Sequence, residues 1–489
     1  MNVQVLLYKC LYSSQYIVRT EYLASIKVWC TLLKSIDEVL KQIEEDNVNW
    51  ILLQFTDLLG SLRQVTVSRF VNALVGRFDG SSVKGFANIE ESDLSLKPDF
   101  STYALIPWNN GTARLICDVY LTSTRLSKDP RYVAQKVDNI LLDQGTKAFV
   151  SAELEFFIFD KVRVKIDTWR QYYEIWSNEG YWSSEAPFNH TKDGYYSHYP
   201  RDRFEDLKIE IGNTLNNYFG LKVEVLHHEV AAASQHEINF RGGSATYLGD
   251  AIQTAKFVIK SLAHKRGFIA TFMPKPIYGD NGSGMHIHVS IWRNNVNLFY
   301  DPNDEYAGLS QFARYFIGGL IEHGRALSAI VSPTVNSYKR LVPGYEAPVY
   351  LVWGKANRSA AIRIPAYNNF DNSTIRIEYR PPDSSSNPYL ASAAIILAGL
   401  DGVKKKIDPG SPTDENVYKM SRERRRSLGI KELPRSLDEA LDELECDNEW
   451  LKPAFSTELI ETYIELKREE ARKIMSYPTP IEIFSYISV

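Results

Sequence analysis

The chain has 489 residues, of which 44% are hydrophobic and 24% are charged, and its formal net charge is −4. This composition is typical of a globular protein and excludes a disordered, a collagen-like and a small disulfide-stabilised chain. The 56 basic residues are outnumbered by 60 acidic ones, so no overall positive field attracts nucleic acid and we expect none as a partner. At roughly 150 residues per domain, the length allows about two or three domains.

The sequence indicates neither a membrane span nor a disulfide framework. The best apolar run, residues 391–400, is about half of the roughly 18 residues that a membrane helix needs, and it predicts a buried helix. The four cysteines are far apart and form no CxxC pair and no zinc spacing, which favours a reducing compartment. They are Cys10, Cys30, Cys117 and Cys446. We therefore expect a cytoplasmic protein without membrane contact.

The N-terminal third of the sequence predicts an extension followed by a small domain. Residues 1–34 scatter charges through an apolar, tyrosine-rich background, unlike a signal peptide. Ser35 and Glu38 fit a capping box, which predicts a helix that ends near Glu45. A buried strand at 50–55 and an alternating one at 63–67 then predict a hairpin, with more short strands up to residue 118. The expected domains are an extension (1–34), a small α+β domain (35–125) and a larger domain (126–489).

The larger domain is predicted to mix helices with alternating strands. Helices are expected from Asp129 to about Gly145 and over 245–266 and 309–329. Strands are expected at 148–160, 222–226, 236–240, 285–292 and 375–379. Residues 165–203 carry many aromatic side chains with little periodicity, and they predict a long irregular segment of functional importance.

The polar faces of three predicted strands hold unusual residues. Side chains two apart on a strand share a face. The three sets that share a face are Glu153 with Glu155, His286 with His288 and Ser290, and Arg376 with Glu378 and Arg380. A solvated face of an antiparallel strand is the simplest reading of any one set. Together, however, they contain almost no lysine, threonine or glutamine, which favours a site.

Further carboxylates extend this cluster and point to metal ions. Glu229 and Glu237 follow the pair His227–His228, and Glu224 precedes it. Carboxylates with one or two imidazoles are suited to Mg²⁺ or Mn²⁺. So many crowded carboxylates would repel one another and raise their pKa values, and two divalent ions would relieve that repulsion. Sites with two metal ions commonly bind phosphate groups during phosphoryl transfer.

Arginines and glycines complete the predicted site. Five arginines lie between residues 340 and 380, and their forks match carboxylate and phosphate oxygens. They are Arg340, Arg358, Arg363, Arg376 and Arg380. The glycines of 281–284 (Asn-Gly-Ser-Gly) let the backbone approach a ligand. No P-loop and no dinucleotide fingerprint is present, so a bound nucleotide must be held in another way.

The ordered motifs resemble those of glutamine synthetases, most closely the type I enzymes of bacteria and archaea. The resemblance covers the chain from about residue 35 to the C-terminus. The matching segments are 55–57, 153–155, 227–229, 235–237, 281–288, 336–348, 357–365 and 376–380. It implies a β-grasp-like N-terminal domain and a catalytic domain built on a curved antiparallel sheet with flanking helices. It also implies a ring-shaped homododecamer whose active sites lie between neighbouring subunits.

The implied reaction is ATP-dependent ligation of ammonia to glutamate through γ-glutamyl phosphate, with two Mg²⁺ or Mn²⁺ ions. One metal would be held by Glu155, Glu229 and Glu237, and the other by Glu153, His286 and Glu378. Glutamate would be bound by Asn281, Gly282, Arg340, Glu346, Arg358 and Arg380. ATP would be bound by Glu224, His288, Ser290, Arg358 and Arg363.

Three of these residues would have catalytic roles. Arg358 would lie between both substrates, and Glu346 would lie on a mobile flap over glutamate. Asp57 would come from the adjacent subunit, help to bind ammonium and take its proton. Without the resemblance, Asp57 reads as a plain turn residue.

The sequence departs from the family pattern at a few positions. Ser373 replaces a lysine that often contacts ATP, and residues 194–200 differ around Tyr195. Tyr418 stands where some relatives are adenylylated, but its surroundings differ and we predict no adenylylation. The altered 194–200 segment leaves open a ligase for a polyamine or alkylamine. A non-catalytic regulatory homologue is the third alternative, although no metal ligand is missing. We expect the apolar C-terminal residues 481–489 to be buried at a subunit contact.

Overall fold

A computed structural model describes residues 35–183, 186–366 and 372–488, so the expectation for the extension 1–34 lies outside the described residues. The first element of the described residues is α2 (Ile36–Glu45), and its predicted capping box is confirmed. The backbone N–H of Glu38 donates to Ser35 Oγ at 3.2 Å, and the N–H of Ser35 donates to Glu38 Oε2 at 2.7 Å. This pairing satisfies two donors that the first turn of a helix leaves unpaired.

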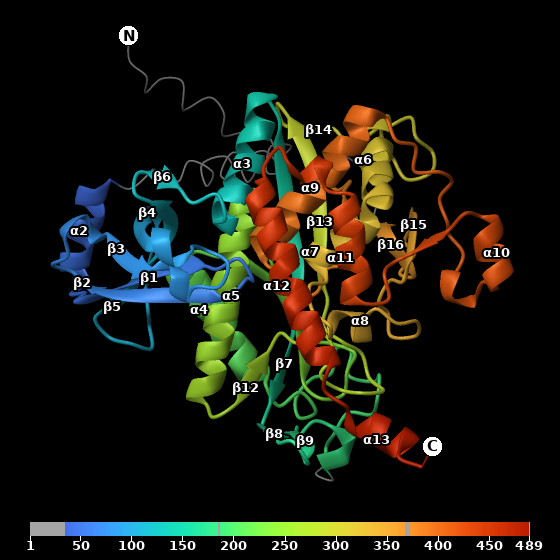
Figure 1. The fold of residues 1–489 in the computed structure, drawn as a ribbon, viewed down its shortest axis with the longest axis horizontal. Helices are drawn as coiled ribbons and strands as arrows, with labels where there is room; N and C mark the ends of the chain where they lie inside the picture. The colour runs from blue at the N-terminus through green and yellow to red at the C-terminus, as the bar shows by residue number, and fades with distance from the viewer. Residues whose placement is uncertain (1–34, 184–185, 367–371, 489) are drawn as a thin grey trace, which may run out of the picture.

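A small mixed sheet follows α2 and forms the blue lobe of Figure 1. Its order is β2-β1-β5-β4-β3, with β6 beside β5. The strands are β1 (Trp50–Thr56), β2 (Leu62–Ser68), β3 (Gly76–Asp79), β4 (Asp93–Leu105), β5 (Thr112–Leu121) and β6 (Thr124–Arg125). The predicted hairpin is β1–β2, and β1 also pairs with β5 in parallel.

The second lobe is built on a ten-stranded sheet in the order β10-β11-β7-β13-β17-β16-β15-β18. Its main strands are β7 (Lys147–Phe159), β10 (Val223–His228), β11 (Gln235–Phe240), β13 (Met285–Arg293), β15 (Tyr350–Lys355), β16 (Ala360–Ile364), β17 (Ile377–Tyr379) and β18 (Lys431–Glu432). The short β12 (Ile269–Thr271) pairs with β7, and β14 (Val296–Asn297) pairs with β13. All pairs are antiparallel except β15 with β16, which agrees with the expected α+β class.

Helices pack against this sheet, as Figure 1 shows for the orange and red segments. They are α3 (Pro130–Asp143), α4 (Glu205–Phe219), α5 (Ala245–Lys265), α6 (Gln311–Glu322), α7 (Gly324–Val331), α9 (Pro388–Lys405), α11 (Leu437–Cys446) and α12 (Thr457–Met475). The apolar run 391–400 lies in α9 and is buried almost throughout. A Cβ at Gly249 of α5 would meet the Tyr389 ring of α9 at 2.1 Å, so only glycine allows these two helices to approach so closely. Within the described ranges, no helix is long and apolar enough to cross a membrane.

Two predicted segments differ from the structure. The helix predicted over 309–329 is broken into α6 and α7 at His323, whose imidazole is held by Asp447 at 2.7 Å and Asp401 at 2.9 Å. The prediction that 165–203 is irregular throughout is also wrong, because β8 (Lys161–Ile166) and β9 (Gln171–Trp176) form a hairpin across its start. Apolar side chains of that hairpin pack against the Phe157–Phe159 cluster, and this packing explains the extended backbone.

The C-terminal segment forms a short helix, α13 (Pro480–Tyr486). Its apolar side chains are exposed on the single chain, with Phe484 84% accessible. The expected burial at a subunit contact therefore stays a prediction.

Candidate active site

The strand register brings the predicted site residues into adjacent rows. His286 on β13 lies opposite Glu153 on β7, and His288 on β13 lies opposite Glu378 on β17. Glu237 on β11 lies between Glu155 on β7 and His227 on β10. Because strand side chains alternate between the two faces of a sheet, these rows point to one face. Arg376 lies just before β17, so the strand predicted from 375 is shorter than expected.

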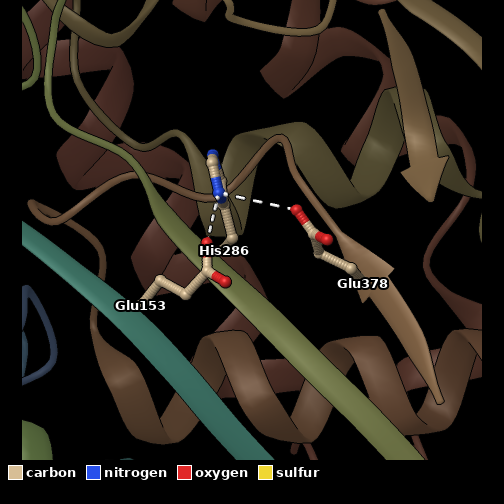
Figure 2. A group of neighbouring side chains, drawn as sticks. All are labelled: Glu153, His286 and Glu378. Atoms are coloured by element: carbon tan, nitrogen blue, oxygen red, sulfur yellow. Dashed lines mark hydrogen bonds and ion pairs between the residues drawn. The ribbon is translucent and has the colours of Figure 1, made fainter. Parts of the chain in front are cut away.

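The first acid–imidazole cluster consists of Glu153, His286 and Glu378. Figure 2 shows the three side chains converging from three neighbouring strands. The Nδ1 atom of His286 is 3.0 Å from Glu153 Oε2 and 3.7 Å from Glu378 Oε1. One ligand atom from each residue lies within 4.8 Å of the others, which is the spacing that a single divalent cation needs.

The second cluster consists of His227, Glu229 and Glu237, and its ligand atoms also lie within 4.8 Å of one another. His227 Nε2 is 3.3 Å from Glu237 Oε1. Glu155, predicted as a ligand here, lines the same cavity, and its Oε2 accepts hydrogen bonds from the Gly284 N–H and Gln235 Nε2, both at 2.9 Å. Four acidic or imidazole groups therefore surround the position predicted for one metal.

The pKa values of these carboxyl groups differ between the two clusters. Burial, together with the charge of Glu237, raises the pKa of Glu155 to about 8. Burial and the charges of Glu155 and Glu237 also raise the pKa of Glu229 well above its usual range. Burial opposes ionisation of Glu378 as well, but Arg380 holds the pKa of this carboxyl at about 2. Among the described residues, the second cluster therefore has less compensating positive charge than the first, where Arg380 and Arg363 bind Glu378 directly.

Arginines surround the end of the cavity near Glu378. Arg380 Nη1 donates to Glu378 Oε1 at 2.6 Å, and Arg363 Nη1 binds the other carboxylate oxygen. Arg340, at the end of α8 (Ser337–Arg340), is 3% exposed, and its Nη1 donates to the carbonyl of Pro381 at 2.9 Å. Arg358 lies exposed in the turn between β15 and β16.

The first cavity has a volume of about 180 Å³ and gathers nearly all of the predicted set. All six predicted metal ligands line it, as do all six residues predicted to bind glutamate. Arg363, predicted to bind ATP, also lies in this cavity. Glu346 lines it from an exposed segment with a backbone φ of 57°, a conformation that is uncommon for a residue with a side chain.

A second, larger cavity of about 620 Å³ adjoins the first. Three predicted ATP-binding residues line it, namely Glu224, His288 and Ser290, and so does the divergent Ser373. Glu153 lines both cavities. The Nε of Arg376 donates to His288 Nδ1 at 3.2 Å, which holds the imidazole at the wall that the two cavities share.

Asp57 is the one predicted site residue that the single chain does not bring to either cavity. It lies in the turn after β1 and is 1% exposed. Its carboxylate accepts from the Ser61 N–H at 2.8 Å and from Arg63 Nε at 2.8 Å. Within one chain this is the bonding of a turn residue.

Sequence reasoning missed His227 and Tyr196 as residues of the cavity. His227 belongs to the pair of histidines that directly precedes Glu229 in the sequence, but only the register opposite Glu237 reveals its position. Tyr196 stacks on Tyr195 with ring centroids 4.2 Å apart, and both rings meet His227 edge-on. His228 and His236 are fully buried and do not line this cavity.

Comparisons with known proteins agree over nearly the whole chain. The family model described as glutamine synthetase, beta-Grasp domain, matches residues 47–122, and that of the glutamine synthetase catalytic domain matches residues 127–486. The glutamine synthetase of Sulfolobus acidocaldarius is 52% identical over 469 residues, covering 93% of this chain and 99% of that protein. The glutamine synthetase of Thermotoga maritima is 42% identical with the same coverage.

Solved structures show the same likeness. The glutamine synthetase of Plasmodium falciparum superposes with a TM-score of 0.85 at 30% identity, covering 93% of this chain and 99% of that chain. A complex of GmaS with ADP superposes with a TM-score of 0.79 at 30% identity, covering 92% of this chain and 99% of that chain.

Proposed function

The chain belongs to the glutamine synthetase family and makes glutamine from glutamate and ammonia with ATP, and from this premise we propose how its residues divide the work. One observation supports the proposal most directly. The six predicted metal ligands and the six predicted glutamate-binding residues line one cavity, and Glu153 joins that cavity to a second one large enough for a nucleotide.

The family depends on a divalent metal, and the donor set fits such ions. We propose two Mg²⁺ or Mn²⁺ ions, one held by Glu153, His286 and Glu378 and one by Glu155, Glu229 and Glu237, with His227 beside the second. Oxygen-rich donors with imidazole suit these cations, and the raised pKa values of Glu155 and Glu229 indicate uncompensated carboxylates. When bound, such ions offset phosphate charge and hold phosphate oxygens.

We propose that the two cavities receive the two larger substrates. ATP occupies the larger one, beside Glu224, His288 and Ser290, with its γ-phosphate at the Glu153 junction. Glutamate occupies the smaller one, where Asn281 and Gly282 position it, and its α-carboxylate pairs with a buried arginine. Among the described residues, the close acceptors of Arg340 are two backbone carbonyls and, at 3.5 Å, His286 Nε2, and no carboxylate forms an ion pair with it, so its charge remains available to a substrate carboxylate.

The γ-carboxylate of glutamate attacks the γ-phosphate of ATP, which gives γ-glutamyl phosphate and ADP; ammonia then attacks the acyl phosphate and releases phosphate. We propose that Arg358 and Arg363 stabilise the charge of the transferring phosphoryl group. Glu346, on its exposed segment, closes over glutamate and keeps water from the intermediate.

We propose that Asp57 acts in the active site of a neighbouring subunit, where it binds ammonium and takes its proton. Asp57 lines neither of these cavities in its own chain, which supports this role. A ring of subunits, and specifically a homododecamer, would provide that arrangement. We further propose a division into the extension 1–34, the domain 35–125 and the catalytic domain 126–489. A cytoplasmic location fits the free thiols of Cys117 and Cys446.

The test is product identification by mass after reaction of ATP, glutamate and Mg²⁺ with ammonium or with a panel of amines. Glutamine with ammonium as the best acceptor supports the proposal. The Tyr195–Tyr196 stack at the cavity favours one second candidate, a ligase for an alkylamine or polyamine, because aromatic walls suit an aliphatic chain. Preference for an amine would support that candidate, and Tyr196→Ala should then change the preference while Tyr199→Ala, 70% exposed at its site, should not. No turnover with any acceptor from assembled protein would support the regulatory homologue.

A further inference from the structure

A third cavity of about 470 Å³ lies between the two lobes and takes no part in the proposed reaction. Its walls come from β4 and β5 of the small sheet, from the end of α4 and from the start of α5. Ile116, Phe219, Leu221, Tyr103 and Tyr247 give it a largely apolar interior. It shares no lining residue with the first cavity, which holds the proposed metal ligands. With the second cavity, where we propose that ATP binds, it shares only Arg241 and Gly242.

One lining residue, Arg114 on β5, is a buried cation that forms no ion pair with any described residue. It is 5% exposed, its Nη2 donates to Thr254 Oγ1 at 3.0 Å, and its guanidinium lies 5.0 Å from the centre of the Phe219 ring. Across the described part of the chain, no acceptor meets its Nε and no carboxylate lies within ion-pair distance. Burial lowers the pKa of Arg114 to about 10, so the group is still charged at neutral pH.

The nearest candidate for a counter-ion is already occupied. Asp250 also lines the cavity, but its carboxylate accepts two hydrogen bonds from Arg131, each at 2.9 Å, and one from Tyr389 at 2.7 Å. Arg131 also forms ion pairs with Asp118 and Asp99, at 2.7 Å each, and the charge of Asp250 acts on Arg114 as well, although the two side chains form no ion pair in direct contact. An unpaired buried charge is costly, so an anion that reaches Arg114 would gain a strong interaction.

The shape and charge of the cavity restrict the anion. Its volume lies in the usual range for small-molecule sites, which is about 300–1,000 Å³. Exposed Lys222 and Arg241 add positive charge at the rim, and such charge attracts anions. The hydroxyl of Thr246 is buried in the same wall, and no described residue forms a hydrogen bond with it. One unpaired guanidinium matches one carboxylate, and the apolar interior matches a hydrocarbon body.

We propose that this interdomain cavity is a binding site for a small organic carboxylate with an aromatic or branched aliphatic body, whose carboxylate pairs with Arg114. A phosphate ester carries a second charge that no further buried cation of the cavity would match. The ligand differs from glutamate, because an ammonium group and a second carboxylate would lie against the apolar walls.

Calorimetry on the assembled, full-length enzyme tests the proposal with phenylacetate and isovalerate as probes. Benzyl alcohol and inorganic phosphate are the comparison compounds. We expect one phenylacetate per chain, weak or no binding of both comparison compounds, and unchanged phenylacetate binding when glutamate is present. Arg114→Gln should weaken phenylacetate binding roughly tenfold or more, as expected for loss of a charge-assisted hydrogen bond. Arg77→Gln, an exposed arginine of the same sheet, is the matched control and should bind as the wild type does.

The proposal would be overturned if neither carboxylate binds, or if Arg114→Gln leaves their binding unchanged. Tighter binding of phosphate than of phenylacetate would also contradict it. If Arg114→Gln fails to assemble, a crystal structure of the wild-type enzyme with phenylacetate decides the question. Density for the carboxylate against Arg114 supports the site, and density elsewhere or none refutes it. Because these measurements need no turnover, their failure is distinct from failure of the proposed reaction.

Discussion

The replacement Glu155→Gln should stabilise the metal-free protein and weaken its response to metal. Glu155 is buried opposite Glu237, and its pKa is about 8 instead of the 4.5 of a free glutamate. At neutral pH the folded, metal-free protein therefore keeps a proton on this carboxyl that the unfolded chain has released. Glutamine has nearly the same shape and can still accept a hydrogen bond from the Gly284 N–H. It does not ionise, so its burial has no cost that depends on pH.

The size and sign of the effect follow from the two pKa values. A carboxyl whose pKa is raised by folding contributes most to the free energy of unfolding below the pKa that it has in the unfolded chain. This contribution falls as pH rises, until the group ionises in the folded protein as well. Between pH 4.5 and 8 the wild type thus loses on the order of 1.4 kcal/mol per pH unit relative to the glutamine variant. At pH 7 the difference is on the order of 3 kcal/mol in favour of the variant, and it vanishes near pH 4.5.

Divalent metal should reverse this order. The ionised wild-type carboxylate is one of the proposed ligands, whereas an amide oxygen carries no charge. Changing even an outer partner of a ligand costs about 10- to 100-fold in metal affinity, so loss of a charged ligand should cost at least roughly tenfold. Because ligand carboxylates must be deprotonated, metal binding to the wild type should also release a proton near pH 7.

Urea unfolding at fixed subunit concentration checks both parts, first with a chelator near pH 5 and pH 7, and then with increasing Mg²⁺. Glu461→Gln, at an exposed site on α12, is the matched control and should follow the wild type. The reasoning is refuted if Glu155→Gln gains no stability over the wild type at pH 7 without metal. It is refuted equally if Mg²⁺ stabilises both proteins to the same extent.

Three other predictions test separate parts of the structure. Arg340→Lys keeps the charge but loses the fork, so steady-state kinetics should show a KM for glutamate raised about tenfold with a smaller change for ATP; equal increases would contradict the assignment. Asp57→Asn and Arg358→Gln should each be inactive alone but should regain activity in mixed, reassembled oligomers, and absence of recovery would place Asp57 outside the neighbour's site. Burial opposes charging of His323, but hydrogen bonds to Asp447 and Asp401 raise its pKa above 6.5. An imidazole whose pKa is raised by folding stabilises the folded protein fully below the pKa that it has in the unfolded chain. This stabilisation is lost as pH rises through the pKa of the folded state. His323→Gln should therefore lower the urea midpoint more near pH 5 than near pH 9, and an equal loss at both would disprove the idea.

The composition of the site could be predicted because strand periodicity is visible in a single sequence. Glu153 and Glu155, like His286 and His288, had to share a face once each segment was a strand. What the sequence could not supply was the register between strands that are far apart in the chain. The placement of His286 opposite Glu153 depends on β13 pairing with β7, and only that pairing turns two polar faces into the cluster that we propose binds a metal.

Other features depend on partners that local pattern does not reveal. Apolar periodicity continues through His323, so it predicts one helix, but Asp401 and Asp447 hold the imidazole from two other segments at the position where the helix bends. The surroundings of Arg114 also could not be predicted from local pattern. Every residue of β5 from Thr112 to Cys117 is buried, so the alternation of polar and apolar residues does not distinguish the two faces of this strand. Burial of an arginine normally implies an ion pair. The carboxylate that could form it, on Asp250, is held by Arg131 from α3. An unpaired charge beside an apolar cavity is therefore a property of the tertiary arrangement, and its consequence for ligand binding could only be inferred once that arrangement was known.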